Sequence, residues 1–454
     1  MKKTKLYLLV SLFSFAPLAA SANSLLDVYE LALQNDAQLK ADQAKYEAGV
    51  ENKTIGRSGL LPQINANAQA GKNDGDSNLK RVPATTTSDY DTTEWSISLN
   101  QPLFDMAAWY SYKQGVKLSE QAEAQFGADQ QSLIVRVAEA YFNVLRAIET
   151  LEATVAEEKA LEKQLEQTKQ RFEVGLTAIT DVHEAQAAYD TSRATTLEAR
   201  GNVSISYEAL EVLTGKPEDQ IAPLSNKFPV IAPVPANRAD WVEFSLKNNY
   251  NLKASKLQAE ASLQNAKANR SGHLPTLDAS LGYSDTTTEG IRESTAIDNE
   301  NDGSSINLRL EVPIYSGGAV SGRSRQAYAQ YTQAQEIYNS TQRNVIQSTR
   351  SLHLSVETDV ASVQARQQAI VSGQSALEAT QSGYEVGTRN LVEVLIAQRN
   401  LYQARRNYSD ARFNYVINSV KLREVAGMLT PADVQRVDQW LMDDALLSRS
   451  QYEN

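Results

Sequence analysis

The chain has 454 residues, of which 42% are hydrophobic and 22% charged, with a formal net charge of −11 and no cysteine. This length favours two or three domains, and the acidic balance argues against nucleic acid as a general partner, because phosphate binding needs clustered Lys and Arg. Without cysteine the chain has neither disulfides nor a cysteine for lipid attachment.

The first 22 residues have the pattern of a secretory signal peptide. Three lysines lie within the first five residues, an apolar run follows at 6–18, and the small residues ASA stand at 20–22. The apolar run is shorter than the about 20 residues that a membrane-spanning helix needs. We therefore expect residues 1–22 to be removed and the protein to be exported.

The remainder of the chain consists of two copies of one unit. NDAQLKADQAKYEAGV from Asn35 corresponds to NNYNLKASKLQAEASL from Asn248, and FEVGLTAITDV from Phe172 corresponds to YEVGTRNLVEV from Tyr384, at offsets of 212–213 residues. A steady offset over such a length indicates a duplicated architecture. The predicted organisation is a first repeat at 23–225, a second repeat at 226–430 and a C-terminal segment at 431–454.

Each repeat opens with a helical stretch, at about 36–58 and 238–270, and continues with strictly alternating apolar and polar residues. Alternation with a period of two predicts strands with one apolar and one polar face. Polar stretches rich in Thr, Asp and Gly occupy 72–94 and 284–305, which we interpret as large solvated loops. The sequence thus predicts β-hairpins at 61–103 and 274–315. The alternating apolar residues are Ile64, Ala66, Ala68, Ala70, Trp95, Ile97 and Leu99 in the first copy, and Leu277, Ala279, Leu281, Tyr283, Ile306, Leu308, Leu310 and Val312 in the second.

A window without proline follows each hairpin, from Pro102 to Pro217 and from Pro313 to Pro431. Ala, Glu, Gln, Leu and Arg dominate both windows, and all are good helix formers. A helix from Met106 to Phe172 would be about 100 Å long at 1.5 Å per residue. Gly175 interrupts the first pattern and Gly387 interrupts the second at the corresponding place. We therefore predict helical hairpins at 106–214 and 318–427. The apolar seam of the first long helix has the 3-4 spacing of a coiled coil, at Ile134, Val137, Tyr141, Val144, Ile148, Leu151 and Val155.

Four strands are too few to stand alone in a membrane. Unpaired strand edges are not tolerated in lipid, and bacterial barrels begin at about eight strands. If the apolar faces contact lipid, several chains must share one barrel. The alternative is a soluble protein in which two small sheets pack face to face.

The chain resembles the outer-membrane efflux channel family typified by TolC, in its unlipidated branch. The resemblance rests on QRFEVGLTAITDV, GYEVGTRNLVEV, the RSG-x-LP turns and VPIYSGG, in this order and spacing. It implies an α+β membrane protein with long antiparallel coiled-coil helices and four β-strands per chain. In a homotrimer these would form a shared 12-stranded β-barrel and a 12-helix periplasmic tunnel.

The resemblance also implies a location and partners. The protein would lie in the outer membrane with a large periplasmic portion and a mixed equatorial region at about 216–240 plus the C-terminal segment. It would be an exit duct of tripartite efflux or type I secretion systems, opened by a periplasmic adaptor that is bound to an inner-membrane transporter. Its strands would contact outer-membrane lipid.

The same resemblance predicts polar links that hold the tips closed. By position, Thr180 and Asp181 of the first hairpin would accept hydrogen bonds from Tyr384 and Arg389 of the second. Such directional bonds at a hydrated surface can break at little net cost in free energy. The alternative is that these are ordinary solvated residues of a coiled coil.

A constriction and an adaptor contact are predicted beside these links. The family carries two acidic rings one helical turn apart, and this chain has an acid at the first position and an apolar residue at the second. The constriction residues are Glu393 and Ile396, and the adaptor-contacting tip residues are Gly175, Leu176, Gly387 and Thr388.

No arrangement of residues predicts an enzyme, a cofactor or a metal site. His183, His273 and His353 are scattered without metal-ligand spacing, and the Gly-rich segment 316–322 lacks the Lys-Ser/Thr of a phosphate loop. The alternative function is a periplasmic coiled-coil adaptor, which also presents a long helical hairpin.

Overall fold

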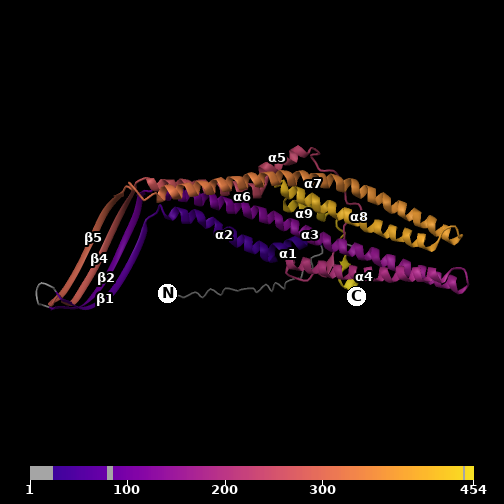
Figure 1. The fold of residues 1–454 in the computed structure, drawn as a ribbon, viewed down its shortest axis with the longest axis horizontal. Coiled ribbons are helices and arrows are strands. Elements are labelled where there is room, and N and C mark those ends of the chain that lie inside the picture. Colours follow the sequence, from indigo (N-terminus) through magenta and orange to yellow (C-terminus); the bar gives the residue numbers. More distant parts are fainter. Residues whose placement is uncertain (1–23, 79–84, 443–444, 454) are drawn as a thin grey trace, which may run out of the picture.

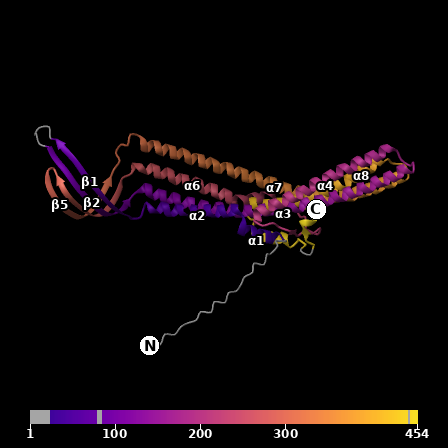
Figure 2. The same cartoon turned by 90° about the horizontal axis from the view of Figure 1, so that it is seen from below.

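The structure is a computed structural model that describes residues 24–78, 85–442 and 445–453. The predicted signal peptide at 1–22 lies outside these residues. The molecule is elongated, with a β-sheet at one end and two helical tips at the other (Figures 1 and 2). Within the described residues, no helix combines the length and the apolar character needed to cross a membrane.

Each repeat begins with a pair of helices, where the sequence predicted one. In the first repeat α1 spans Leu25–Asn35 and α2 spans Ala37–Ser58, and in the second α5 spans Arg238–Asn248 and α6 spans Tyr250–Arg270. The predicted helical stretch at 238–270 is thus helical at both ends and divided at Asn249. Asn249 interrupts it, because its side chain caps the second helix by accepting from the amide of Leu252 at 2.9 Å.

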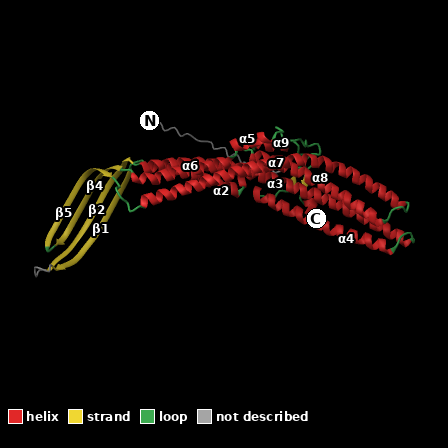
Figure 3. Ribbon diagram, turned by 45° about the horizontal axis from the view of Figure 1, so that its top comes forward, coloured by secondary structure: helices red, strands yellow, loops and turns green. Residues whose placement is uncertain are grey.

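The four strands form one antiparallel sheet in the order β1-β2-β4-β5. The sheet lies at one end of the molecule, beyond the helices (Figure 3). One sheet in place of two excludes the face-to-face soluble alternative. The strands are β1 Gln63–Asn78, β2 Thr85–Phe104, β4 Thr276–Arg292 and β5 Thr295–Glu311.

The predicted large loops are strand at 72–78, at 85–94 and over most of 284–305, whereas 79–84 lie outside the described residues. β1 and β2 stay in register from Gln63↔Asn100 to Asn78↔Thr85, and β4 and β5 pair without interruption to Arg292↔Thr295. Glu293 and Ser294 alone connect β4 to β5, with φ of 50° and 62°. Two consecutive positive φ angles match a type I′ turn, whose twist suits a two-residue hairpin. Polar composition in these segments therefore marks solvated strands.

Two helices run the whole distance from the sheet to the tips. α3 spans Met106–Glu173 with 68 residues, and α7 spans Ala319–Glu385 with 67. Their partners α4, at Ile179–Thr214, and α8, at Leu391–Val425, return from the tips only to the middle of the molecule (Figure 1). The remaining length of α3 and α7 is accompanied by α2 and α6.

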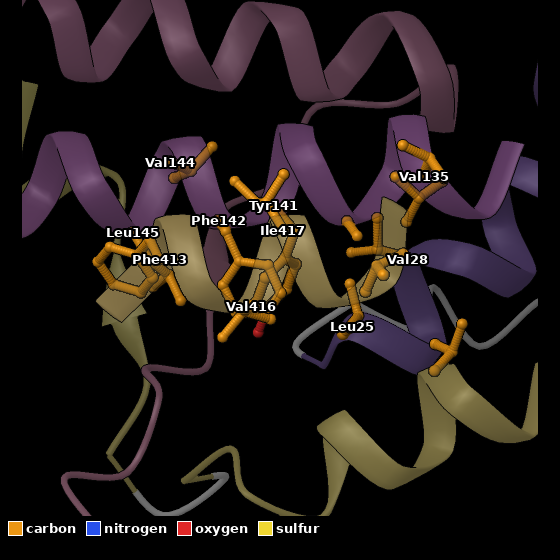
Figure 4. Packing of buried hydrophobic residues seen from close by; sticks show 14 of the residues in the cluster. Leu25, Val28, Val135, Tyr141, Phe142, Val144, Leu145, Phe413, Val416 and Ile417 are labelled. Atoms are coloured by element: carbon orange, nitrogen blue, oxygen red, sulfur yellow. The ribbon is translucent and has the colours of Figure 1, made fainter. Parts of the chain in front are cut away.

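The main hydrophobic core lies at this middle level, where α1, α3, α4 and α8 meet. The ring of Phe142 on α3 contacts both Phe413 of α8 and the neighbouring ring of Tyr141, in the cluster that Figure 4 shows. The predicted seam of α3 is confirmed, since all its members from Ile134 to Leu151 are buried in this core and Val155 packs against it. Small elements surround the core at the same level. They are the strand pair β3 Gln220–Ile221 and β6 Leu447–Ser448, helix α9 at Pro431–Asp438 and helix α10 at Ser450–Glu453. The 3-10 turn η1 at Ser271–His273 lies elsewhere, between α6 and β4 near the sheet.

Asp36 joins the start of α2 to α3 and makes stability depend on pH. Its carboxylate accepts from Arg136 at 2.6 Å and from the amide of Leu39 at 2.9 Å. Burial opposes ionisation, but these hydrogen bonds outweigh it, so the pKa of Asp36 lies below its usual value. A lowered carboxyl pKa stabilises the folded state above the unfolded pKa, and this contribution is lost as pH falls through the folded-state pKa.

We expect Asp36→Asn to lower the free energy of unfolding by about 1.5–3 kcal/mol at neutral pH, the worth of hydrogen bonds to a charged group. Asn can still cap the helix, so the change isolates the charge. The deficit should shrink as the pH falls below about 4. Denaturation followed by circular dichroism at pH 7 and pH 3 measures it, with Asp42→Asn as control, since Asp42 on the same helix is half-buried and accepts from the neutral Gln38. An equal deficit at both pH values would contradict this reading.

Candidate functional site

The two helical tips are built by the same turn. α3 and α7 end just before Gly175 and Gly387, whose φ angles are +77° and +82°. The amide of Leu176 donates to the carbonyl of Arg171 at 2.8 Å, and the amide of Thr388 donates to that of Gly383 at the same distance. This is the Schellman closure of a helix, in which glycine adopts the left-handed conformation at little cost. The four predicted tip residues thus lie at the end of the molecule.

The helices that return from the tips begin with polar contacts inside each hairpin. At the start of α4, the hydroxyl of Thr177 donates to Asp181. At the start of α8, Asn390 caps the amide of Glu393 at 2.9 Å, and Arg389 donates to the Glu393 carboxylate at 2.6 Å. An i,i+4 ion pair of this kind stabilises a helix surface weakly. The carboxylate of the predicted constriction is therefore paired with a cation of the same tip, two residues before α8 begins.

A small apolar cluster joins the two hairpins just above the tips. Leu165, Ala185 and Leu391 are buried together, and Tyr384 packs against them. The guanidinium of Arg171 lies 4.8 Å from the centre of the Tyr384 ring, a cation–π distance. Beside them, a cavity of about 420 Å³ is lined by polar side chains of α3 and α7.

The predicted links are not made within one chain. Among the described residues, the hydroxyl of Tyr384 is buried without a hydrogen-bond partner, and Arg389 pairs with Glu393 instead of reaching Thr180 or Asp181. The side chain of Arg389 is 59% exposed, so its outer side is open to another molecule. A link from Arg389 to a neighbouring copy stays a prediction.

Ile396 faces a groove between the two hairpins. A groove of about 500 Å³ runs along α3, α4 and α8, and Ile396, Val392 and Leu395 form part of its apolar floor. Arg399 and Arg406 line the same groove. An apolar ring at this height, as the sequence predicted, requires copies of the chain around an axis.

Polar contacts between α3 and α8 above the tips were missed by the sequence analysis. Glu157 accepts from Arg406 at 2.7 Å, and Glu149 accepts from Ser409 and lies near Arg412. Burial raises the pKa of Glu149, although Arg412 and Ser409 act in the opposite direction. The sequence offered only two acids eight residues apart on α3, Glu149 and Glu157, and Arg residues on α8. Such charges are common on any coiled coil, so they did not single out these contacts.

The tips also expose apolar side chains. Val174, Leu176 and Val386 are mostly exposed at the two turns. Exposed apolar groups at the end of a monomer often mark a contact with another protein. Within the described residues, no group of His, Asp and Glu is arranged to hold a metal ion.

Comparison with known proteins gives matches over the whole length. The sequence profile of the family described as "Outer membrane efflux protein" matches residues 28–216 and 241–428. "Outer membrane protein TolC" of Vibrio cholerae is 36% identical over 425 residues, covering 93% of this chain and 95% of that protein. "Proteases secretion protein PrtF" of Dickeya chrysanthemi is 31% identical and covers 99% of this chain and 97% of its own.

A solved structure shows the same fold. The outer membrane protein VceC of Vibrio cholerae superposes with a TM-score of 0.74 over 89% of this chain and 96% of that one, at 18% sequence identity. At this identity the likeness speaks for the arrangement of helices and strands.

Proposed function

Because the chain belongs to the outer membrane efflux protein family, we propose that three copies assemble into an exit duct of the outer membrane. The duct carries substrates from an inner-membrane pump across the periplasm and the outer membrane, in efflux and in type I secretion. TolC-type and PrtF-type relatives support both uses. We further propose that the two matched segments, 28–216 and 241–428, correspond to the predicted repeats 23–225 and 226–430.

The observation that carries this proposal is the open edge on each side of the chain. The sheet ends in β1 and β5, whose backbone groups on the outer side lack a strand partner within the described residues. The helices lie in the orders α2-α3-α6-α7 near the sheet and α4-α3-α8-α7 near the tips, so α7 is an edge throughout and α2 and α4 are the opposite edge. Copies joined edge to edge would close the sheet and the layer of helices at once. A sheet in lipid has to be closed, because unpaired backbone groups at an open edge are not tolerated there.

The edge helix α4 supports the same assembly. Leu197, Ile205 and Val212 are mostly exposed at spacings of eight and seven residues, so they lie along one face. Such a stripe favours burial against the α7 edge of a neighbouring copy. The periplasmic adaptor would contact Gly175, Leu176, Gly387 and Thr388 at the tips, with the inner-membrane transporter beyond it.

We expect the protein extracted from outer membranes to have the mass of three chains in detergent and to conduct ions in planar bilayers. Ile205→Glu should weaken the trimer, because it places a charge in the buried edge. Thr195→Glu should not, because it places the same charge on the side of α4 that lines the groove within the chain. Native mass spectrometry measures both. A monodisperse monomer that conducts would contradict the shared duct.

The adaptor alternative has less support. A periplasmic adaptor usually carries one helical hairpin between the halves of a small β domain. This chain has two helical hairpins, and its four long strands form one continuous sheet. We also propose that the protein catalyses no reaction, in keeping with family members described as outer-membrane and secretion proteins.

A further inference from the structure

The two faces of the sheet differ in chemistry, most clearly near the helical end, where one of them is apolar. Side chains alternate between faces along a strand, so the strand register groups residues into lateral rows. On one face, Ile64, Leu99, Leu281 and Ile306 form one row; on the other, Asn65, Ser98, Gly282 and Ser305 form the next. In the proposed trimer the first face contacts lipid where it is apolar, and the polar face lines the bore. Farther from the helices the first face carries charges, among them Asp285, Asp302 and Glu300.

The bore face is almost free of charge. Its rows from Gln63 outward contain Asn, Gln, Ser, Thr and Gly at nearly every position. Asp278 and Arg309 lie opposite each other at the helical end and offset one another. Arg292 lies at the far end, where it stacks on Tyr90 at 5.7 Å.

Glu94 is the exception. It is the one charged residue on this face of β1, β2, β4 and β5 in the rows between that of Asp278 and that of Arg292, leaving aside Asn78. Its row neighbours are Gln69 and Thr286, and the row ends at Asn301. Within the chain, the row therefore holds no cation.

Resting on the proposed duct, we propose that Glu94 determines the charge preference of the outer-membrane part of the bore. Three copies place three carboxylates in one ring, on a bore face that carries no other charge at that height. A ring of acids concentrates cations and repels anions. This ring is separate from the predicted constriction at Glu393 and acts on substrates after they have passed the tips.

The absence of cysteine in the chain allows a local test from the outer side. In Ser96→Cys, the thiol lies on the bore face, two residues from Glu94. We would compare its reaction rates with a cationic trimethylammonium and an anionic sulfonate methanethiosulfonate reagent, added from outside to reconstituted trimers and read as a change in current. Because the reagents enter from the outer side, the ratio of their reaction rates does not depend on passage through the narrow tips.

The ratio of cationic to anionic rates at Ser96→Cys should exceed that of a free thiol by about threefold to tenfold. Adding Glu94→Gln should abolish the excess. Glu300→Gln is the matched control, because Glu300 lies in the row beside Glu94, on the opposite face. It should leave the ratio unchanged.

Two outcomes overturn the inference in distinguishable ways. If Ser96→Cys reacts but Glu94→Gln leaves the ratio unchanged, or Glu300→Gln lowers it equally, Glu94 has no such role and the duct stands. If Ile97→Cys reacts with both reagents and Ser96→Cys with neither, the polar face does not line a bore, and the proposed duct fails with it.

Discussion

Arg389→Ser is expected to raise the open fraction of the channel by about tenfold or more. Hydrogen bonds to charged groups are worth about 1.5–3 kcal/mol, and each 1.4 kcal/mol changes a two-state equilibrium about tenfold. Because Arg389 is exposed beyond its pair with Glu393, we propose that it also holds Asp181 or Thr180 of a neighbouring copy. Single-channel recording in planar bilayers measures the change.

The partner variants make this prediction specific. Asp181→Ala should raise the open fraction in the same way. The double variant should add little to either single change, since both remove the same link. Arg389→Ser should also increase cation preference, because it leaves Glu393 without its cation. Asp181→Ala should not, and Glu393→Gln should alter ion preference while leaving opening largely unchanged.

Arg405→Ser is a suitable control, since Arg405 lies on the same helix and stacks on Tyr402 away from the tips. If both link variants conduct as the parent does, the closed state is held elsewhere. Packing of Ile396 and its apolar neighbours would then be the first place to look.

Gly427→Ala is expected to lower the free energy of unfolding by about 2–5 kcal/mol. Gly427 has φ of +68° after the end of α8, and a Cβ there would lie 2.3 Å from the carbonyl oxygen of Asn248. The left-handed conformation costs an alanine about 1–2 kcal/mol, and forcing the two backbones apart adds the cost of overpacking. Denaturation followed by circular dichroism measures the loss.

The duplication supplies a matched control for this change. Gly215, at the end of α4, has φ of +69°, but a Cβ there would meet only the side chain of Asn35 at 3.2 Å. Gly215→Ala should therefore cost about 1–2 kcal/mol, the conformational part alone. Equal losses at the two positions would show that the approach to Asn248 contributes nothing.

Periodicity in the sequence predicted the long elements well. The seam from Ile134 to Leu151 and the lack of proline required an uninterrupted helix, and α3 begins at the predicted Met106. The extent of the strands was missed, because segments such as Asp89 to Thr93 have the composition of loops. Their partner strands stabilise them, and a single strand's sequence carries little information about pairing.

The candidate site was predictable only in part. Gly175 and Gly387 stand out in sequence because glycine is costly inside a helix, and both adopt the left-handed turn. Which residues meet across the tips depends on the partner copy, so one chain leaves Arg389 on Glu393 and Tyr384 without a hydrogen-bond partner among the described residues. The capping by Asn249 was not foreseen, since a single Asn in a helical pattern is ambiguous.

The position of the main core along α3 has a mechanical consequence. Tyr141 and Phe142 lie in the large core at mid-length, whereas near the tips the hairpins are joined by the small cluster around Leu165 and Leu391 and by Arg171 over the Tyr384 ring. A rod held firmly in the middle and loosely at one end pivots, and the loosely held end travels furthest. In the proposed duct, the opening at the tips would thus widen when whole helices tilt about the core at mid-length. No helix would have to unwind, and the sheet would stay undisturbed.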